Sequence, residues 1–326
     1  SRGYVGIGTV RPSQPLHLVS GNSNVVVDSR GNVGIGTINP QGNLQIAGSL
    51  SNVVVDSRGY VGVGTTVPAQ PLHVEGNMYL NGNISAGNLG MFRNRIINGD
   101  MRIDQRNAGA AVTNVAGGDT WLIDRYFFIC RLASKLSAQQ SSTAPAGFTY
   151  STLITSLSAY TPVTSDYYGF AQRIEGYNIA DLGWGTSNAQ PITVSFWVRS
   201  SVTGTYTINL QPQSYARSYS TTYTINSANA WQYIVITFPG DTSGSWNTTN
   251  GLGLRLWFDL GSSDTTYAVT TPGVWQAGDK IRVANTVNFV ATNGATYYIT
   301  GVQLEKGTIA TPFEFRPYSI ELQLCQ

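Results

Sequence analysis

One phrase is repeated at the start of the chain, and its period restricts the possible folds more than any other feature. It reads VVVDSRGNVGIGTINP at residues 25–40 and VVVDSRGYVGVGTTVP at residues 53–68, and residues 1–12 carry a partial copy, SRGYVGIGTVRP. Equivalent residues lie 28 positions apart, at Ser1, Ser29 and Ser57 and at Pro12, Pro40 and Pro68. A fixed period of this length is typical of an array of similar supersecondary units.

Each unit predicts short strands separated by tight turns. The apolar run at 25–27 is followed by DSRG, whose glycine can adopt a positive φ, and then by alternating Gly and Val or Ile. After the proline, the triplet at 16–18 and its equivalents alternate apolar and polar residues, as half-buried strands do. His17 and His73 share their repeat position with Gln45, so we expect outward-facing polar side chains there rather than ligands or bases.

Such a unit presents an apolar row with nothing to cover it, because no helix or second sheet is encoded nearby. Identical chains that pack these rows around a common axis would bury them. We therefore expect a homotrimeric β stem over residues 1–80, in which the chain associates with two copies of itself. A single-chain β-solenoid is the alternative.

Composition and charge exclude several classes of partner. Charged residues are 11% of the 326 residues and helix-building Glu/Lys/Ala stretches are absent, so we expect an all-β chain. The net charge of +2 comes from scattered basic residues, which argues against nucleic acid as a partner. The sequence has no apolar run of about 18 residues, so we do not expect membrane insertion. Cys130 and Cys325 lack metal-site spacing, and GIGTIN lacks the third glycine of a dinucleotide site, so no metal or cofactor is expected.

The period ends at NGNISAGNLG, a Gly- and Asn-rich stretch that predicts a hinge at residues 81–90. The head, residues 91–326, then consists of strand-like runs between turn clusters, without a long helix. These runs are PITVSFWVRSS, GTYTINLQPQ, WQYIVITFPG, LGLRLWFDLG, KIRVANTVNFVA and ATYYITGVQLEKG. Many short strands with Gly, Asn, Ser and Asp turns predict a β-sandwich of the jelly-roll type.

Two of these runs alternate in a way that predicts a binding face. At 192–199 and 252–260, one side of each run is aliphatic or Phe and is expected in the core, whereas the other mixes Trp with charged residues. Flat rings stack on the C–H faces of sugars, and charged planar groups bind hydroxyls. If the two strands are neighbours, they form one carbohydrate-binding face, made of Trp197, Arg199, Arg255, Trp257 and Asp259. The alternative is that these tryptophans pack against a neighbouring subunit or a covering loop.

Three turn segments rich in aromatic and amide residues, at 166–170, 213–223 and 240–251, predict adaptable recognition loops. We expect Tyr215, Tyr219 and Trp246 to contribute to ligand binding from these loops. Ordinary polar loops, each anchored by one ring, are the alternative.

The repeats and several segments of the head together resemble the fibres of viruses. Tandem GNVGIGT units followed by proline are common in tail fibres and receptor-binding fibres of bacteriophages and large algal viruses. The head is similar to the C-terminal domain of such fibres in RNRIINGDMRIDQRNAG, DTWLIDRYFF, FAQRIEGYNIADLGWGT, PITVSFWVRSS and GVQLEKGTIATPFEFRPYSIELQLCQ. The resemblance implies a virion fibre whose head binds host-surface glycan for attachment. Because the chain starts inside a repeat, we expect an upstream segment that contacts other virion proteins.

Two other functions fit the same sequence. A structural trimerisation head would bind no ligand, and a polysaccharide-degrading fibre would need a pair of carboxylates across a cleft. No spacing marks such a pair among Asp119, Asp124, Glu175, Asp181 and Asp259. Because the head has no histidine, Ser-His-Asp and Cys-His catalysis is excluded there, and we do not expect an enzyme. Asp119 and Asp124 are expected to form ion pairs or turn hydrogen bonds.

Overall fold

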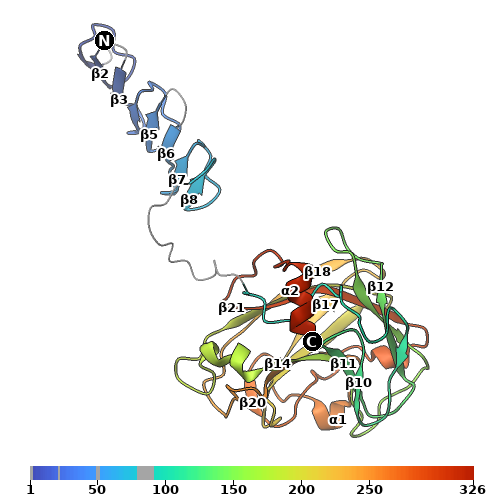
Figure 1. Ribbon diagram of the computed structural model, residues 1–326. Coiled ribbons are helices and arrows are strands. Elements are labelled where there is room, and N and C mark those ends of the chain that lie inside the picture. The colour runs from blue at the N-terminus through green and yellow to red at the C-terminus, as the bar shows by residue number, and fades with distance from the viewer. Residues whose placement is uncertain (1–2, 21–22, 49–51, 79–91) are drawn as a thin grey trace. The chain divides into compact units, whose positions relative to one another are not determined.

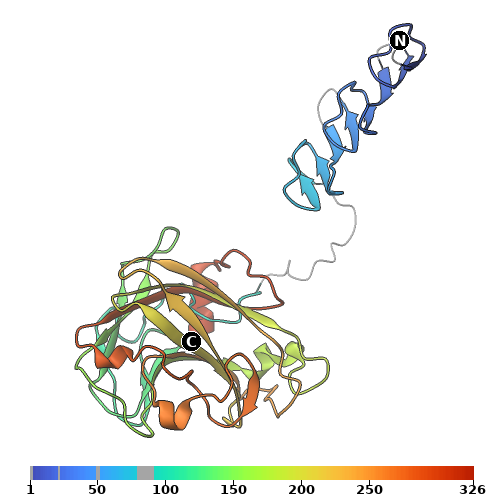
Figure 2. The ribbon, with the colours of Figure 1, turned by 180° about the vertical axis from the view of Figure 1, so that it is seen from behind.

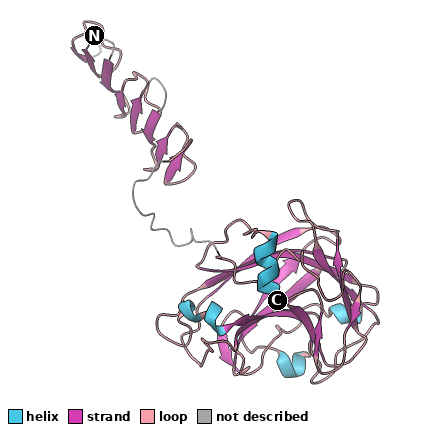
Figure 3. Ribbon diagram, in the orientation of Figure 1, coloured by secondary structure: helices cyan, strands magenta, loops and turns pink. Residues whose placement is uncertain are grey.

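The computed structural model describes residues 3–20, 23–48, 52–78 and 92–326 (Figure 1). The chain divides into two compact units, Ser1–Ser85 and Ala86–Gln326, which we call the stem and the head. The predicted hinge at 81–90 lies outside the described residues. Strands dominate both units and the helices are short (Figure 3), so the all-β class is confirmed. None of the helices in the described ranges has the length and apolarity that crossing a bilayer requires.

The stem is one sheet whose eight strands follow one another in chain order. They are β1 (Val5–Ile7), β2 (Leu16–Ser20), β3 (Ser23–Val27), β4 (Val33–Ile35), β5 (Leu44–Ala47), β6 (Asn52–Val55), β7 (Val61–Val63) and β8 (Leu72–Val74). The strand before the DSRG turn pairs antiparallel with the strand after it, and that strand pairs in parallel with the next. Gly31 and Gly59 hold this turn with φ of 85° and 80°, a region that favours glycine.

The register of the stem aligns apolar residues into two unbroken ladders on one face. The first ladder runs Ile7, Leu18, Val25, Ile35, Ile46, Val53, Val63 and Val74, and the second runs Val5, Leu16, Val27, Val33, Leu44, Val55, Val61 and Leu72. Several members are open to solvent within the single chain, including Ile7 at 58% and Leu72 at 58%. The predicted uncovered apolar row is therefore present.

The opposite face of the stem is closed by its own loops, and one prediction about it is wrong. His17 and Gln45 were expected to face outward, but only 7% and 6% of their surfaces are exposed. The Nδ1 atom of His17 accepts a hydrogen bond from the Ser13 N–H (3.2 Å), and its Nε2 pairs with the Asn24 Oδ1 (2.8 Å). Gln45 makes the same two contacts one unit later through its amide oxygen and nitrogen. An imidazole and a carboxamide are interchangeable here because each offers one acceptor and one donor at similar positions.

The head contains two antiparallel sheets, which Figures 1 and 2 show as stacked layers. In spatial order, the seven-stranded sheet consists of β10 (Asp119–Trp121), β11 (Tyr126–Cys130), β14 (Tyr168–Glu175), β19 (Leu252–Asp259), β16 (Gly204–Gln211), β17 (Arg217–Ile225) and β20 (Trp275–Ala277). The six-stranded sheet consists of β18 (Gln232–Phe238), β15 (Ile192–Ser200), β21 (Thr296–Lys306), β13 (Ser151–Ser156), β12 (Leu136–Ser141) and β9 (Val112–Thr113). The helices are α1 (Asp264–Tyr267) and α2 (Tyr318–Cys325), with 3-10 turns η1 (Gly176–Asn178), η2 (Ala180–Leu182) and η3 (Phe289–Ala291).

The inner faces of the two sheets meet in a single large core. Phe196 on β15 packs edge-on against Phe258 on β19, with ring centroids 5.1 Å apart. The hydroxyls of Tyr223 on β17 and Tyr297 on β21 hydrogen-bond across the core at 2.7 Å. The alternating residues of β15 and β19 that were predicted to face inward, such as Val194 and Leu256, are fully buried. The predicted sandwich is therefore confirmed.

One predicted strand of the head is absent. The segment KIRVANTVNFVA, residues 280–291, contains only an isolated bridge at Arg282 and ends in η3. The buried guanidinium of Arg282 donates to the carbonyl of Thr286 (2.6 Å) and pairs with Asp259 (2.6 Å). The segment therefore folds around an internal cation instead of extending along a neighbouring strand.

Candidate functional site

The predicted carbohydrate-binding face is divided between the two sheets of the head. β15 belongs to the six-stranded sheet and β19 to the seven-stranded sheet, so the strands are not neighbours and their polar sides point in opposite directions. Trp197 and Arg199 therefore lie apart from Arg255 and Trp257. The prediction of one continuous face is wrong, because alternation along a strand identifies its two faces but not its partner strands.

Three of the predicted ligand residues serve the interior of the head. Asp259 is 1% exposed and held by the guanidinium of Arg282, which leaves it inaccessible to a ligand. Tyr219 and Trp246 were expected on recognition loops, but they are only 6% and 8% exposed. Both pack edge-on against Trp275, at ring-centroid distances of 5.3 and 5.4 Å. Tyr219 lies on β17, so the predicted loop at 213–223 is a strand from residue 217 onward, whereas Trp246 anchors its loop with a ring that extends into the core.

The structure does bring three other predicted residues together on the outward side of the seven-stranded sheet. The guanidinium of Arg255 lies 4.5 Å from the ring centroid of Tyr215 and 4.8 Å from that of Trp257. Trp257 itself is only 1% exposed, in a small cluster with Phe127 and Ile281. Of this group, Arg255 and Tyr215 remain candidates for ligand contact, and Trp257 supports them from below.

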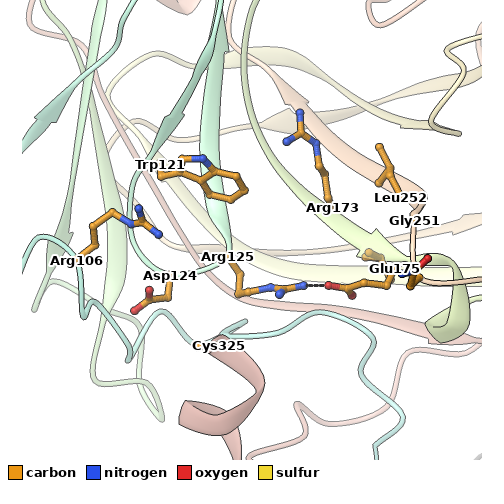
Figure 4. Close-up of a pocket in the computed structure, with 11 residues that line it drawn as sticks. Arg106, Trp121, Asp124, Arg125, Arg173, Glu175, Gly251, Leu252 and Cys325 are labelled. Atoms are coloured by element: carbon orange, nitrogen blue, oxygen red, sulfur yellow. Dashed lines mark hydrogen bonds and ion pairs between the residues drawn. The ribbon is translucent and has the colours of Figure 1, made fainter.

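Beside this group lies a cleft that the sequence did not predict. Two pockets share Arg173 of β14, and we call them together the Arg173 cleft. The Trp121 pocket, of about 350 Å³, is also lined by Arg125, Glu175 and Leu252 (Figure 4). The Arg255 pocket, of about 270 Å³, has a lining that includes Asp119, Tyr167, Arg173, Tyr215, Arg255, Trp257, Tyr267 and Asp279.

Arg173 and Asp119 form the wall between the two pockets, and the pairing of β10, β11 and β14 brings them together. Arg173 extends over the ring of Phe127, with its guanidinium 4.3 Å from the ring centroid, and forms two hydrogen bonds to Asp119 (2.5 and 3.0 Å). This confirms the expectation that Asp119 forms an ion pair. Trp121 lies two residues after Asp119 on the same strand, and its side chain is 40% exposed. Its ring contacts that of Phe127, with 5.1 Å between the ring centroids. The cleft thus combines an open indole with a fixed planar cation and a carboxylate.

The carboxylates of the Trp121 pocket are engaged by protein groups. Burial opposes ionisation of Glu175, but hydrogen bonds from Arg125 and from backbone outweigh it and lower the pKa of this carboxyl. Figure 4 shows the Arg125 side chain extending to Glu175, with which it forms an ion pair. Asp124 accepts a hydrogen bond from the Gln105 N–H at 2.7 Å, as expected for a turn carboxylate. These groups are suited to hold hydroxyls and to fix the pocket's shape.

Trp197 lines a separate pocket on the six-stranded sheet. This Trp197 pocket, of about 730 Å³, is walled by Phe148, Tyr233, Phe313 and Phe315, and none of its described lining residues is charged. Its polar side chains are those of Ser195 and Thr311 besides the aromatic heteroatoms. Arg199 lies outside it and stacks on Tyr298 at 5.1 Å. The pocket is larger than the Arg173 cleft but offers few groups that could orient a polar ligand.

The part of the chain that the structure describes contains no group of three or more His, Cys, Asp or Glu side chains that could hold a metal ion. Cys130 is buried and Cys325 lies on α2, and the two are not joined in a disulfide. Burial raises the pKa of the Cys325 thiol to about 12, so it stays protonated and unreactive at neutral pH.

Comparison with known proteins identifies no family. No family model and no curated protein matches the chain. Among solved structures, the enzymatically active domain of tailspike protein 4 of bacteriophage CBA120 aligns at 11% identity and a TM-score of 0.34, over 66% of this chain and 21% of that one. The family 11 carbohydrate-binding module from Clostridium thermocellum, in complex with a mixed-linked tetrasaccharide, aligns at 11% identity and 0.30, over 61% and 98%. The N-terminal cellulose-binding domain of a Cellulomonas fimi glucanase aligns at 10% and 0.30, over 53% and 85%. Similarities this low carry no inference about function.

Proposed function

We propose that this chain is a segment of a homotrimeric virion fibre, with a stem that assembles through its apolar ladders and a head that binds host-surface carbohydrate in the Arg173 cleft. The placement on a virion is supported by the resemblance of the repeats and head segments to viral fibres. The carbohydrate is supported by the chemistry of the cleft.

The observation that carries the glycan assignment is the exposed indole of Trp121 beside the Arg173–Asp119 pair. An indole offers a flat apolar surface to the C–H face of a pyranose, and an ion pair fixed on the rim offers donors and acceptors to its hydroxyls. The sequence pattern did not single out Trp121 as a ligand residue. A short strand of three residues shows too little alternation to reveal which side its tryptophan faces.

The test is glycan binding by the full chain, first on an array and then by titration with the best ligand. Trp121→Ala should weaken binding at least tenfold without changing assembly, because a stacking ring is lost from the surface. Phe315→Ala is the matched variant, since Phe315 is an exposed ring (55%) that lines the Trp197 pocket instead. Loss of binding in Phe315→Ala but not in Trp121→Ala would refute the cleft as the site.

The trimer is supported by the two apolar ladders, which a single chain leaves uncovered. Burial of their side chains would contribute roughly 25 cal/mol for each Å² removed from water, summed over sixteen positions on each chain. Ile46→Asp places a charge on a ladder and should convert trimer to monomer in sedimentation experiments. Ile38→Asp is the control, because Ile38 has a similar exposed fraction (38% against 42%) but lies between strands and outside both ladders. A monomeric parent protein, or equal effects of the two changes, would contradict the proposal.

Glu175 is unsuited to the general-acid role of a glycosidase, and we therefore favour binding without hydrolysis. A glycosidase needs a carboxylic acid that stays protonated until it reaches the leaving group. The lowered pKa of Glu175 keeps it ionised near neutral pH. Release of reducing ends from a bound polysaccharide would overturn this part of the proposal.

A further inference from the structure

Arg255 differs from the other buried arginines of the head. Arg255, Arg282 and Arg316 are 5%, 1% and 8% exposed. Arg282 pairs with Asp259 at 2.6 Å, and Arg316 pairs with Glu321 at 3.2 Å. Within the described part of the chain, no carboxylate forms an ion pair with Arg255, whose guanidinium donates instead to the neutral side-chain oxygen of Gln211.

Arg255 has charges of both signs around it, since Asp119, Asp279 and Arg173 line the same pocket. Its direct cross-strand partner on β14 is Arg173, and like charges placed opposite each other destabilise a sheet. The nearest carboxylates are already engaged, since Asp119 pairs with Arg173 and Asp279 accepts from the Gln211 amide at 2.7 Å. No carboxylate among the described residues contacts the Arg255 guanidinium directly, and a buried cation without an ion-paired carboxylate is costly, so a functional reason for it is expected.

The guanidinium is also held in one plane. The rings of Tyr215 and Trp257 lie within 4.8 Å of it, which leaves its edge as the direction from which a ligand can approach. This edge borders the Arg255 pocket, whose volume of about 270 Å³ is slightly below the roughly 300 to 1,000 Å³ of typical ligand sites. One sugar unit is therefore the expected occupant. A planar carboxylate matches a fixed guanidinium edge through parallel N–H···O bonds.

We propose that the Arg255 pocket binds the carboxylate of an acidic sugar, such as a uronic acid unit of the host glycan, with Arg255 as the anion-binding residue. This inference rests on the proposed function and specifies its ligand class. Neighbouring sugar units would then extend over Arg173 toward Trp121, which supplies binding to the neutral part of the glycan.

The experiment titrates the full chain with an oligogalacturonate, with the same oligosaccharide after reduction of its carboxyl groups, and with a sulfated oligogalactan. We expect at least tenfold tighter binding of the carboxylated form than of the reduced form. Arg255→Gln should abolish this preference while retaining the weaker binding of the reduced form. Arg199→Gln is the matched control, because Arg199 also stacks on a ring and forms no ion pair within the described ranges, but it lies on the other sheet.

Each outcome separates the two proposals. Equal binding of carboxylated and reduced oligosaccharides, or tighter binding of the sulfated one, overturns the carboxylate assignment and leaves glycan binding intact. Failure to bind any glycan in the array overturns both. If Arg255→Gln does not fold, the preference of the unmodified protein between the carboxylated and reduced forms decides the question.

Discussion

Replacement of Trp257 tests whether this residue supports the cleft from the interior or binds ligand directly. Its indole is 1% exposed and occupies the space above Gly169, where an added Cβ would lie 2.0 Å from the ring carbon Cζ2. Trp257→Ala should therefore cost about 3 to 5 kcal/mol in the free energy of unfolding of the head. For a domain of this size, that corresponds to a decrease in Tm of roughly 6 to 20 °C.

The contact between Trp257 and Gly169 allows a sharper experiment, a double-mutant cycle. Gly169→Ala alone forces the indole to move and should cost about 1 to 3 kcal/mol through overpacking. In the double variant the ring is gone, and the methyl group added at position 169 enters the space it leaves. The double variant should therefore be more stable than additivity predicts, by about 1 to 3 kcal/mol.

The assay is urea and thermal denaturation of the four proteins, followed by far-UV circular dichroism so that loss of the indole does not alter the signal. Trp121→Ala serves as control, because its ring is 40% exposed and should cost much less. Strict additivity in the cycle, or an unchanged Tm in Trp257→Ala, would refute the packing argument. In that case Trp257 would return as a candidate ligand residue.

Three further predictions concern the rest of the chain. Gly36→Ala should unfold its stem unit, because a Cβ there would lie 2.3 Å from the Ala47 carbonyl oxygen. In Gly31→Ala the new Cβ meets no atom within 4 Å, so this change should cost only about 1 kcal/mol of backbone strain, and circular dichroism of the stem transition compares the two variants. The folded-state pKa of Glu175 lies below its unfolded value of about 4.3, so ionised Glu175 stabilises the head above that pH, and this contribution is lost as the pH falls through the folded pKa. Glu175→Gln should therefore lower Tm at pH 7 but match the parent protein in strong acid. A fragment of residues 91–326 should melt like the head of the full chain, because both of its sheets lie after residue 91, and an unfolded fragment in circular dichroism would count against an autonomous head.

The stem was predictable because its signals are local and repeated. Period-two alternation and the DSRG turn lie within single units, and three copies confirm one another. The burial of His17 was missed for a specific reason. Its two hydrogen-bond partners are Ser13, on a loop, and Asn24, on the next strand. The sequence pattern does not reveal these partners, so His17 was predicted to face solvent although its hydrogen bonds are formed inside the stem.

The cleft was not predictable because it depends on pairings between distant strands. The faces of β15 and β19 were correctly assigned, but their sheets were not, since nothing in a strand's alternation specifies its neighbours. Arg173 and Asp119 are separated by 54 residues and meet only because β10, β11 and β14 are adjacent. Arg255 and Trp257 were selected for their chemistry, and their roles diverge because Trp257 faces a covering segment that contains Ile281.

The two ladders of the stem also limit how such a protein can change in length over evolution. Recombination between neighbouring repeats of the gene removes or adds one 28-residue unit, which is three strands or about 14 Å of sheet, and leaves both ladders in phase. An insertion of one residue inside a strand instead turns its apolar side chains toward the opposite face and interrupts both ladders. Stems related to this one should therefore differ in length by whole units, with insertions of other sizes confined to the loops between strands.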